Sequence, residues 1–335
     1  AVANADDTGR YAGRNLLFTD SEMIAITAVA GYIPEGRLDS AERFEDFAIN
    51  QTFLDTKIGV RKVARKDAGE ETSDLCVRAY EALCAKHDVD AESIDCIVVC
   101  TQNPDGGGIP HVSAITHGKL GLPKTCAGFD ISLGCSGFVY GLSVAGAFMQ
   151  ANGLRNGLFF TADPYSKIVD PNDKNTCLLF GDGAAVTLLQ ETDDAPHGWT
   201  PSAFSFFSDG ARGNALMVET DTLHMNGRAV FTFSATEAPK LIDATLEKAG
   251  MSRGDADLYL LHQGSKYIVD TIRDRLELAP EKVPSNLAKA GNTVSSSIPL
   301  LLAEHMNNDD VSRIVLCGFG VGLSAASCVI TRRTP

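Results

Sequence analysis

The sequence predicts an α/β fold made of two copies of one β/α unit. In each copy a helical pattern, expected to begin at Thr72 or Ser73 and again at Thr236, leads into a short apolar strand, at 94–100 and at 258–261. Matching landmarks lie 164, 161, 157 and 156 residues apart (236−72, 262−101, 292−135 and 318−162). A near-constant spacing is typical of an internal repeat. The alternation of strands and helices favours a mostly parallel sheet with helices on its faces.

The repeat divides the 335 residues into three segments. Residues 1–22 are polar and rich in Gly and Asp, and we interpret them as an extension, native or engineered, outside the fold. Residues 23–195 form the N-terminal half and residues 196–335 the C-terminal half. A chain of this length can bury one large core shared by both halves.

In the N-terminal half, residues 23–31 are an apolar strand that leads into a turn at Pro34-Glu-Gly36. Ser40 can cap a short helix that ends near Ala48, and residues 58–65 form an extended basic segment. Residues 94–100 are a continuous apolar run, which is typical of a parallel strand covered on both faces.

In the C-terminal half, the helix that begins at Thr236 is expected to end near Gly250, and the sequence Asp255-Ala-Asp257 makes a turn into the strand 258–261. A second apolar strand covers 314–318 and matches 158–162 of the first half. The two halves therefore repeat the same order of helix, turn and strand.

The composition describes a globular chain, with 44% hydrophobic residues, 21% charged residues and a formal net charge of −14. This charge disfavours nucleic acid and anionic membranes as partners. No apolar run approaches the ~18 residues of a membrane span, and no secretory signal is visible. The nine cysteines are odd in number and contain no CxxC pair, and the histidines lack metal-ligand spacing. We therefore expect a cytoplasmic protein with reduced thiols and no metal.

Cys135 is the candidate nucleophile. It lies between Gly134 and Gly137, after a strand-like run and before a helix whose apolar positions include Phe138 and Val144. The glycines permit a sharp turn and close approach by a ligand, and the positive end of the helix dipole is expected to lower the thiol pKa. The alternative is a buried structural cysteine.

Two further polar residues occupy equivalent strand ends and helix starts. His262 follows the strand 258–261, and Asn292 stands where Cys135 stands in the first half. Reactive groups gather at such positions in parallel α/β units. Each residue alone also has a structural explanation, because His262 could be a satisfied strand-end histidine and Asn292 a turn residue beside Gly291.

These residues support acyl transfer through a thioester. A thiolate would attack an acyl thioester, and the tetrahedral oxyanion would accept hydrogen bonds from the Cys135 N–H and from the glycine-rich loop. The residues of that loop are Phe319, Gly320, Val321 and Gly322. His262 and Asn292 could both donate to one carbonyl oxygen, and so stabilise the enolate formed when a second thioester loses carboxylate.

A basic cluster follows the first turn, in an otherwise acidic protein. It contains Lys57, Arg61, Lys62, Arg65 and Lys66 within ten residues. We weigh two interpretations equally, a solvated basic face and a site for a phosphate or an acidic partner.

Five motifs, in this order, resemble the signatures of the 3-oxoacyl-[acyl-carrier-protein] synthase III family over about residues 23–331. They are Asp130-Ile-Ser-Leu-Gly-Cys-Ser-Gly-Phe, Phe180-Gly-Asp-Gly-Ala-Ala, Met225-Asn-Gly-Arg-Ala-Val-Phe, His262-Gln and Gly291-Asn-Thr-Val-Ser-Ser-Ser-Ile-Pro.

The resemblance implies a thiolase-like fold of two duplicated halves, with mixed sheets and helices in layers, usually as a homodimer. It implies a Cys135, His262 and Asn292 triad, with Phe319 near the malonyl site. The cysteine would be acylated from acyl-CoA and condensed with malonyl-ACP, or with malonyl-CoA, with release of carbon dioxide. No permanently bound cofactor is expected, and acyl carrier protein would be a partner.

Several positions depart from the family pattern. Phe53 stands where many members have a Trp that stacks on the CoA adenine, and Lys57 and Lys174 replace arginines that meet CoA phosphates. Arg61 is kept, but lysine loses the bidentate fork of arginine. Tyr267 replaces an arginine linked to ACP docking, and Lys266 is adjacent. The expected contacts with CoA and ACP are therefore Phe53, Lys57, Arg61, Lys174 and Lys266.

Ile109 occupies a position where the family often has a Phe that closes the acyl pocket across the dimer. A smaller side chain there could admit a longer or branched acyl group. Together the departures favour a specialised ketosynthase, in fatty-acid initiation or in a secondary pathway.

The alternatives are a family member that only transfers acyl groups, one that condenses without decarboxylation, and a non-catalytic subunit of a heterodimer. A small-molecule binding protein is a further alternative.

Overall fold

Nine strands form one sheet at the centre of the protein. The structure, a computed structural model, describes residues 23–192 and 197–333. The sheet has the order β11-β12-β13-β8-β1-β7-β6-β4-β5. Its strands are β1 (Ile24–Tyr32), β4 (Cys96–Cys100), β5 (Ala127–Ile131), β6 (Asn156–Ala162), β7 (Ala184–Glu191), β8 (Trp199–Ser208), β11 (Leu258–Leu261), β12 (Arg313–Gly320) and β13 (Ser324–Arg332). Two small sheets of two strands each lie outside it. One pairs β2 (Gly36–Asp39) with β3 (Lys62–Arg65), and the other pairs β9 (Leu216–Glu219) with β10 (Thr222–Met225).

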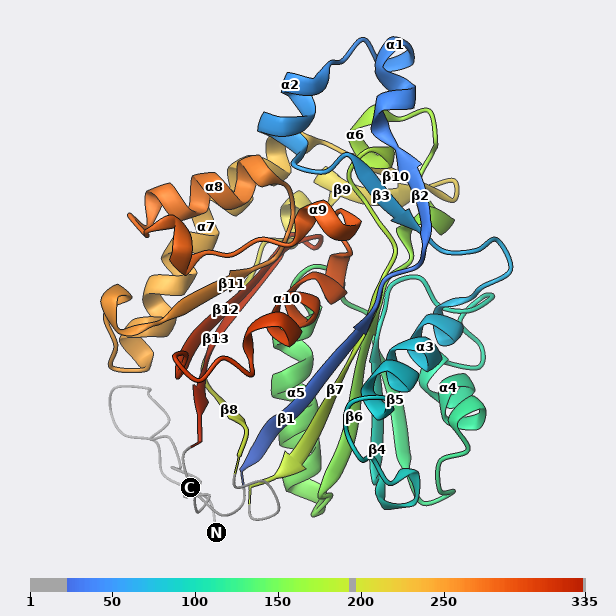
Figure 1. The fold of residues 1–335 in the computed structure, drawn as a ribbon, viewed down its shortest axis with the longest axis vertical. Helices are drawn as coiled ribbons and strands as arrows, with labels where there is room; N and C mark the ends of the chain where they lie inside the picture. The colour runs from blue at the N-terminus through green and yellow to red at the C-terminus, as the bar shows by residue number, and fades with distance from the viewer. Residues whose placement is uncertain (1–22, 193–196, 334–335) are drawn as a thin grey trace.

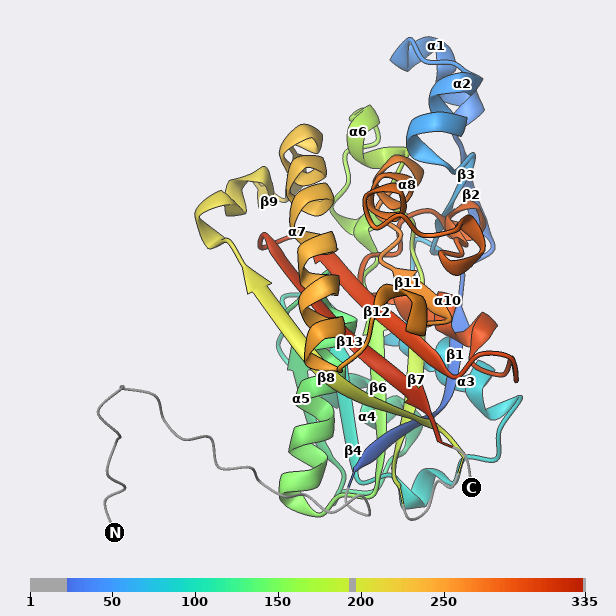
Figure 2. The same cartoon turned by 90° about the vertical axis from the view of Figure 1, so that its left-hand side faces the viewer.

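The helices cover the sheet in layers (Figures 1 and 2). Helices α3 (Thr72–Cys84) and α4 (Val112–Leu120) lie on the outer side of the N-terminal strands, and α7 (Gly227–Lys248) and α8 (Lys266–Arg275) on the outer side of the C-terminal strands. Between them lie α5 (Gly137–Asn152) and α10 (Ser297–His305), which contact strands of both halves. The short helices are α1 (Phe44–Phe47), α2 (Gln51–Phe53), α6 (Lys174–Cys177) and α9 (Leu287–Ala290).

The duplication is visible in the strand directions. In the first half β4 is parallel to β6, and β6 is antiparallel to β7; in the second, β11 is parallel to β12, and β12 is antiparallel to β13. The halves meet where β1 pairs with β8 through Ile26 and Trp199. The boundary at residues 195 and 196 stays a prediction, because 1–22 and 193–196 lie outside the described residues.

The expectation of a mostly parallel sheet is wrong. Only β4–β5, β4–β6 and β11–β12 are parallel among the described strand pairs, and the other five neighbouring pairs are antiparallel. Strand β13 follows β12 through a tight turn, and such a connection produces an antiparallel pair. Strand β7 follows β6 after residues 163–183, which contain α6, and returns antiparallel to it.

Two helix starts also differ from the expected ones. Thr236 does not begin a helix but lies inside α7, because the Asn226 side chain accepts from the Ala229 N–H at 3.1 Å and caps that helix ten residues earlier. At the first turn Asp39, rather than Ser40, is the cap, since its carboxylate accepts from the Ala41 N–H at 3.0 Å. Both carboxylate and amide oxygens are good N-caps.

Helix α5 packs its apolar face into the core and leaves one predicted position outside. Phe138 is fully buried and stacks on Phe159 with ring centroids 5.7 Å apart. Val144 was expected on the same face, but its side chain is exposed. Because burying a large side chain contributes about 1.5–3 kcal/mol, the buried face of α5 holds the Cys135 turn firmly against the sheet.

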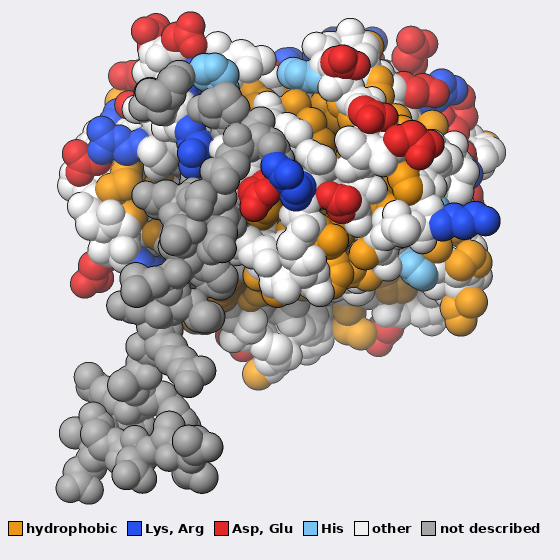
Figure 3. Space-filling view, turned by 90° about the horizontal axis from the view of Figure 1, so that it is seen from below, with side chains coloured by type: hydrophobic (Ala, Val, Ile, Leu, Met, Phe, Trp, Pro, Cys, Tyr) orange, Lys and Arg blue, Asp and Glu red, His pale blue; other side chains and the backbone are white. Residues whose placement is uncertain are grey.

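The end of the molecule opposite α1 and α2 carries acidic, basic and hydrophobic side chains interspersed, as Figure 3 shows. No helix in the described part of the chain combines the length and apolarity needed to cross a membrane.

Candidate active site

A cavity of about 460 Å³ lies between the two halves at the ends of their strands. Its deep wall consists of buried residues, among them Cys135, His262 and Asn292, and its rim carries the exposed side chains of Lys57, Lys174 and Arg228. The cavity thus joins a charged opening to an apolar interior that holds the three predicted catalytic residues.

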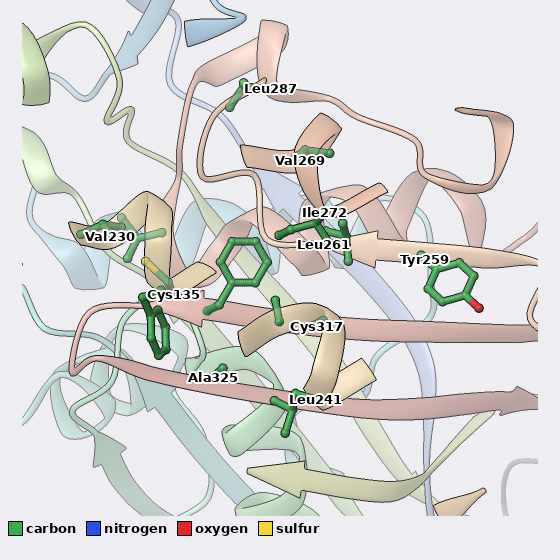
Figure 4. Packing of buried hydrophobic residues seen from close by; sticks show 14 of the residues in the cluster. Cys135, Val230, Leu241, Tyr259, Leu261, Val269, Ile272, Leu287, Cys317 and Ala325 are labelled. Atoms are coloured by element: carbon green, nitrogen blue, oxygen red, sulfur yellow. The ribbon is translucent and has the colours of Figure 1, made fainter. Parts of the chain in front are cut away.

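Cys135 lies one residue before Ser136, the N-cap position of α5, and is almost fully buried. Figure 4 shows its side chain beside Val230, at the edge of a hydrophobic cluster. The flanking glycines serve close packing of the protein on itself. A Cβ on Gly134 would lie 2.6 Å from atoms of both Gln102 and Val321. The turn is therefore held by its neighbours as well as by the helix.

The thiol pKa differs from the sequence-based expectation. Burial raises the pKa of Cys135 to about 12, and the nearby charge of Asp163 acts in the same direction, whereas a hydrogen bond from the Val321 N–H opposes it. The predicted lowering of this pKa is wrong, because loss of water outweighs the favourable backbone groups. Near pH 7 Cys135 is therefore a neutral thiol, and its attack on a thioester needs a proton acceptor.

The glycine-rich segment is the end of β12 and a tight turn into β13. Gly320 has φ +154°, and a Cβ there would lie 2.7 Å from the Cys135 Sγ. Phe319 packs edge-on against the His262 ring, with centroids 5.4 Å apart. Phe319 and Gly320 line the cavity, whereas Val321 approaches Cys135 through its N–H and Gly322 lies in the turn outside the lining.

His262 follows β11 and is buried. Its backbone N–H donates to the Cys317 carbonyl at 2.9 Å, and its ring Nδ1 lies 2.7 Å from the Oγ of Ser297. Burial lowers the pKa of His262 to about 3, opposed by a hydrogen bond to the Val294 carbonyl. The imidazole is therefore neutral near pH 7.

Asn292 is oriented by the chain around it. Its Oδ1 accepts from the Val294 N–H at 2.9 Å, and its Nδ2 lies 3.4 Å from the Gly264 carbonyl oxygen. Because Oδ1 is held by a donor, the amide NH₂ is the group that can act on a ligand. Cys135, His262 and Asn292 all line the same cavity. In the sequence His262 lies 127 residues after Cys135 (262−135) and Asn292 lies 157 residues after it (292−135).

The structure separates the predicted CoA and ACP contacts into two groups. Phe53, Lys57 and Lys174 line the cavity, and the Lys57 Nζ lies 3.6 Å above the ring of Tyr267, which is stacked on Phe231 at 4.9 Å. Arg61 and Lys266 do not line it.

The basic cluster does not gather at the cavity. Arg61 and Lys62 pair with Asp39 at 3.2 and 3.9 Å, and outside the cluster Lys266 pairs with Asp270. Arg65 is structural, because its guanidinium donates to the carbonyls of Phe180 and Cys177. Only Lys57 of this cluster lines the cavity.

Ile109 lies far out on the surface, with 94% of its side chain exposed. It does not line the cavity of its own chain. Residues 23–192 and 197–333 contain no group of His, Cys, Asp and Glu that could hold a metal ion, and all nine cysteines are free thiols.

The start of α7 contributes site residues that sequence reasoning missed. Arg228, Val230, Phe231 and Ser234 line the cavity because α7 begins at Gly227. The signal was the Asn226-Gly227 pair, which marks a capped helix start before an apolar run. Ser297 was also missed, since only the fold shows that it touches His262.

Comparisons with known proteins agree on one family. The model of 3-oxoacyl-[acyl-carrier-protein] synthase III matches residues 129–210, and that of its C-terminal part matches residues 246–332. A beta-ketoacyl-[acyl-carrier-protein] synthase III of Lactococcus lactis subsp. lactis is 34% identical over 324 residues, covering 91% of this chain and 98% of the relative.

Solved structures lead to the same family. A crystal structure of a 3-oxoacyl-(acyl-carrier-protein) synthase III matches with a TM-score of 0.85 and 33% identity, covering 92% of this chain and 99% of that one. The synthase III of Pseudomonas aeruginosa PAO1 matches with a TM-score of 0.84 and 30% identity, over 93% and 99% of the two chains. The fold is therefore thiolase-like, as expected.

Proposed function

Because the chain belongs to the 3-oxoacyl-[acyl-carrier-protein] synthase III family, we propose that it is a ketosynthase that condenses an acyl group held on Cys135 with malonyl-ACP. The observation that carries the proposal is the meeting of Cys135, His262 and Asn292 in one cavity. The product is a 3-oxoacyl thioester, and carbon dioxide is released. Family membership makes the protein an acyl-transferring enzyme, and the acyl donor, the partner and the role of each residue are the proposed parts.

In the first half-reaction, the Cys135 Sγ attacks the carbonyl carbon of an acyl-CoA. A new Sγ–C bond forms, the bond from that carbon to the CoA sulfur breaks, and the thiol proton ends on the departing CoA thiolate. The oxyanion of the tetrahedral intermediate accepts from backbone N–H groups beside the sulfur, which include that of Cys135. The short approach of Gly320 to Sγ supports this role for the end of β12.

In the second half-reaction, malonyl-ACP, or malonyl-CoA, enters the same cavity. Its thioester oxygen accepts from Asn292 Nδ2, and from His262 Nε2 when that nitrogen carries a proton. These bonds strengthen as loss of carbon dioxide turns the thioester into an enolate. The enolate carbon attacks the acyl carbon, and Cys135 leaves as a thiolate that takes up one proton. Phe319, packed on His262, makes this wall apolar, which favours loss of a charged carboxylate.

The rim of the cavity suits a phosphate-bearing donor. Lys57, Lys174 and Arg228 place three cations around the opening, in a chain with a net charge of −14. Phe53 and Tyr267 add aromatic surface at the same place, and both are able to stack on a base. Arg61 and Lys266 lie outside the lining and could meet a bound carrier only after leaving their carboxylate partners.

We also propose that the enzyme is a cytoplasmic homodimer in which Ile109 of one chain reaches the acyl pocket of the other. Ile109 is 94% exposed in the single chain, so it is free to reach a second chain. Val144 on α5 and Phe206 on β8 are further exposed apolar side chains that a partner chain could cover. A small residue at position 109 favours longer or branched acyl groups.

Mass spectrometry tests the acylation step. The protein is incubated with a series of acyl-CoAs of increasing length and branching, digested, and the peptide that contains Cys135 is examined for the added acyl mass. Cys135→Ala is the variant, and Cys317→Ala, which removes a buried thiol outside the cavity lining, is the control. Acylation of the control but not of Cys135→Ala is expected. Absence of any adduct on Cys135 in the wild type would refute the proposal.

A further inference from the structure

Both partners of Cys135 depend on one short turn, residues 292–297. Val294 has φ +52°, a left-handed conformation that a β-branched residue rarely adopts. Its N–H donates to Asn292 Oδ1 at 2.9 Å, and its carbonyl accepts from Ser297 Oγ at 3.0 Å. Strain of this kind persists where the surrounding contacts require it. The backbone of Val294 is thus held where its N–H orients Asn292 and its carbonyl accepts from Ser297.

The hydroxyl of Ser297 has three neighbours, and all three can be satisfied in only one way. Its Oγ lies 2.7 Å from His262 Nδ1, 3.3 Å from the Gln263 N–H and 3.0 Å from the Val294 carbonyl oxygen. The carbonyl only accepts and the Gln263 N–H only donates, so the single hydroxyl proton goes to Val294. Oγ is then an acceptor toward His262, and Nδ1 must carry a proton.

The Val294 carbonyl strengthens this assignment, because it is itself within hydrogen-bonding reach of the His262 ring. That carbonyl also accepts the Ser297 hydroxyl proton, so the hydroxyl has none left to donate to Nδ1. In a neutral imidazole only one nitrogen carries a proton. The Nε2 of His262 consequently meets the cavity as a lone pair.

We propose that Ser297 is a positioning residue that keeps the proton on His262 Nδ1, so that Nε2 is the one working nitrogen and first acts as the proton acceptor for Cys135. This inference rests on the proposed condensing function and specifies how protons move in it. In acylation the Sγ proton passes to Nε2 and then to the departing CoA thiolate. The neutral thiol of Cys135 and the neutral state of His262 agree with this starting point.

Condensation then needs a proton from solvent. The neutral His262 has no N–H toward the cavity, so it can donate to the enolate oxygen only after Nε2 has gained a proton. The same proton passes to the Cys135 thiolate when the carbon–sulfur bond of the acyl-enzyme breaks. One proton is consumed for each carbon dioxide released, which balances the reaction, and Nδ1–H stays on Ser297 throughout.

The other titratable groups around the cavity are few in the described part of the chain. Lys57, Lys174 and Arg228 are at the rim, and Tyr267 is on α8. Asp163 lies buried beside Cys135, and Ser295 donates to it at 2.5 Å. Burial raises the pKa of Asp163 to about 6 and raises the pKa values of Tyr165 and Cys100, which also lie close to Cys135. We therefore assign the predicted pH dependence of condensation above pH 7 to His262, with the rim cations acting on donor binding.

The test measures the two half-reactions separately in wild type, Ser297→Ala and Ser297→Thr. Acylation of Cys135 is followed by rapid-quench mass spectrometry, and condensation by carbon dioxide release from preformed acyl-enzyme. Loss of a general base costs about 100-fold or more. Ser297→Ala is expected to slow acylation at least ten-fold at pH 7 and to slow condensation much less, and Ser297→Thr, which keeps the hydroxyl, is expected to restore acylation.

Ser296→Ala is the matched control, because Ser296 is buried in the same turn but donates to the Thr161 carbonyl at 2.9 Å and does not touch His262. A structural role for the turn would lower both half-reactions together in either variant. Equal losses in the two half-reactions of Ser297→Ala, or no rescue by Ser297→Thr, would overturn the proposal.

Two measurements on the wild type need no variant. The ¹⁵N spectrum of histidine-labelled protein is expected to show His262 as the Nδ1–H form, and the condensation rate is expected to fall as pH rises from 7 to 9. An Nε2–H form in the resting enzyme, or a condensation rate independent of pH, would contradict the proposal. If the wild type forms no acyl-enzyme at all, the proposed function fails instead, and the ¹⁵N spectrum still decides the tautomer.

Discussion

The contact between Gly320 and the Cys135 sulfur makes Gly320→Ala a sharp test of the site geometry. A Cβ built at Gly320 would lie 2.7 Å from Sγ and 2.8 Å from the cysteine Cβ, whereas ordinary contacts begin at 3.4 Å. The two residues must therefore separate by at least 0.7 Å (3.4 − 2.7). The φ of +154° is also unfavourable for alanine. A displacement of about 1 Å in a reacting group costs roughly 100-fold in rate.

We expect Gly320→Ala to acylate Cys135 roughly 100-fold more slowly than the wild type while remaining folded. The assay is single-turnover acylation with saturating acyl-CoA, quenched and read by mass spectrometry, with thermal unfolding recorded alongside. Gly210→Ala is the control, because no atom lies within 4 Å of a Cβ at that position. If Gly320→Ala acylates at the wild-type rate, the end of β12 does not position the nucleophile and the reasoning is refuted.

Three further predictions concern protonation, the rim and the dimer. The pKa of His262 is about 3 in the folded protein and about 6.5 in the unfolded chain. Between these values the unfolded chain binds more protons, so the free energy of unfolding falls by on the order of 1.4 kcal/mol per pH unit as pH falls from 6.5 toward 3. Urea unfolding at pH 7 and pH 4.5 should show a larger acid loss for wild type than for His262→Asn, and equal losses would contradict the burial of this ring. Lys57→Ala should raise the KM for acyl-CoA with little change in kcat, and added salt should weaken this effect. The control is Lys289→Ala, which breaks an ion pair with Glu304 outside the cavity lining. An unchanged KM for Lys57→Ala would show that Lys57 does not bind the donor. Ile109→Phe should shorten the longest acyl group that the enzyme accepts, as read from competition between acyl-CoAs, and an unchanged chain-length preference would exclude residue 109 from the pocket.

The three residues of the candidate site could be found in the sequence because their positions follow from the repeat. Cys135 and Asn292 precede helices at equivalent places, and His262 follows a strand whose counterpart ends at Cys100. Strand direction could not be found in the same way, because the antiparallel strands β7 and β13 are also buried on both faces and show the same continuous apolar runs as parallel strands. The start of α7 was displaced to Thr236 by the polar residues within the helix, although Asn226 carried the true cap signal.

The electrostatics of the site depend on burial, which residue types alone do not determine. The helix start beside Cys135 suggested a lowered thiol pKa, but the fold surrounds the sulfur with apolar side chains and raises it. The basic cluster likewise separates in space, since Arg65 turns inward to backbone carbonyls while Lys57 reaches the cavity. The contact of Ser297 with His262 joins two segments 35 residues apart and appears only when the fold is known.

The central claim is that Cys135 carries the acyl group that is condensed with a malonyl thioester. The most direct measurement isolates the acyl-enzyme, removes free acyl-CoA, and adds malonyl-ACP in a single turnover. The expected result is that each mole of acyl group lost from Cys135 yields one mole of carbon dioxide and one mole of a 3-oxoacyl thioester. Acyl-enzyme that persists with malonyl-ACP present, or 3-oxoacyl product formed by Cys135→Ala, would contradict it.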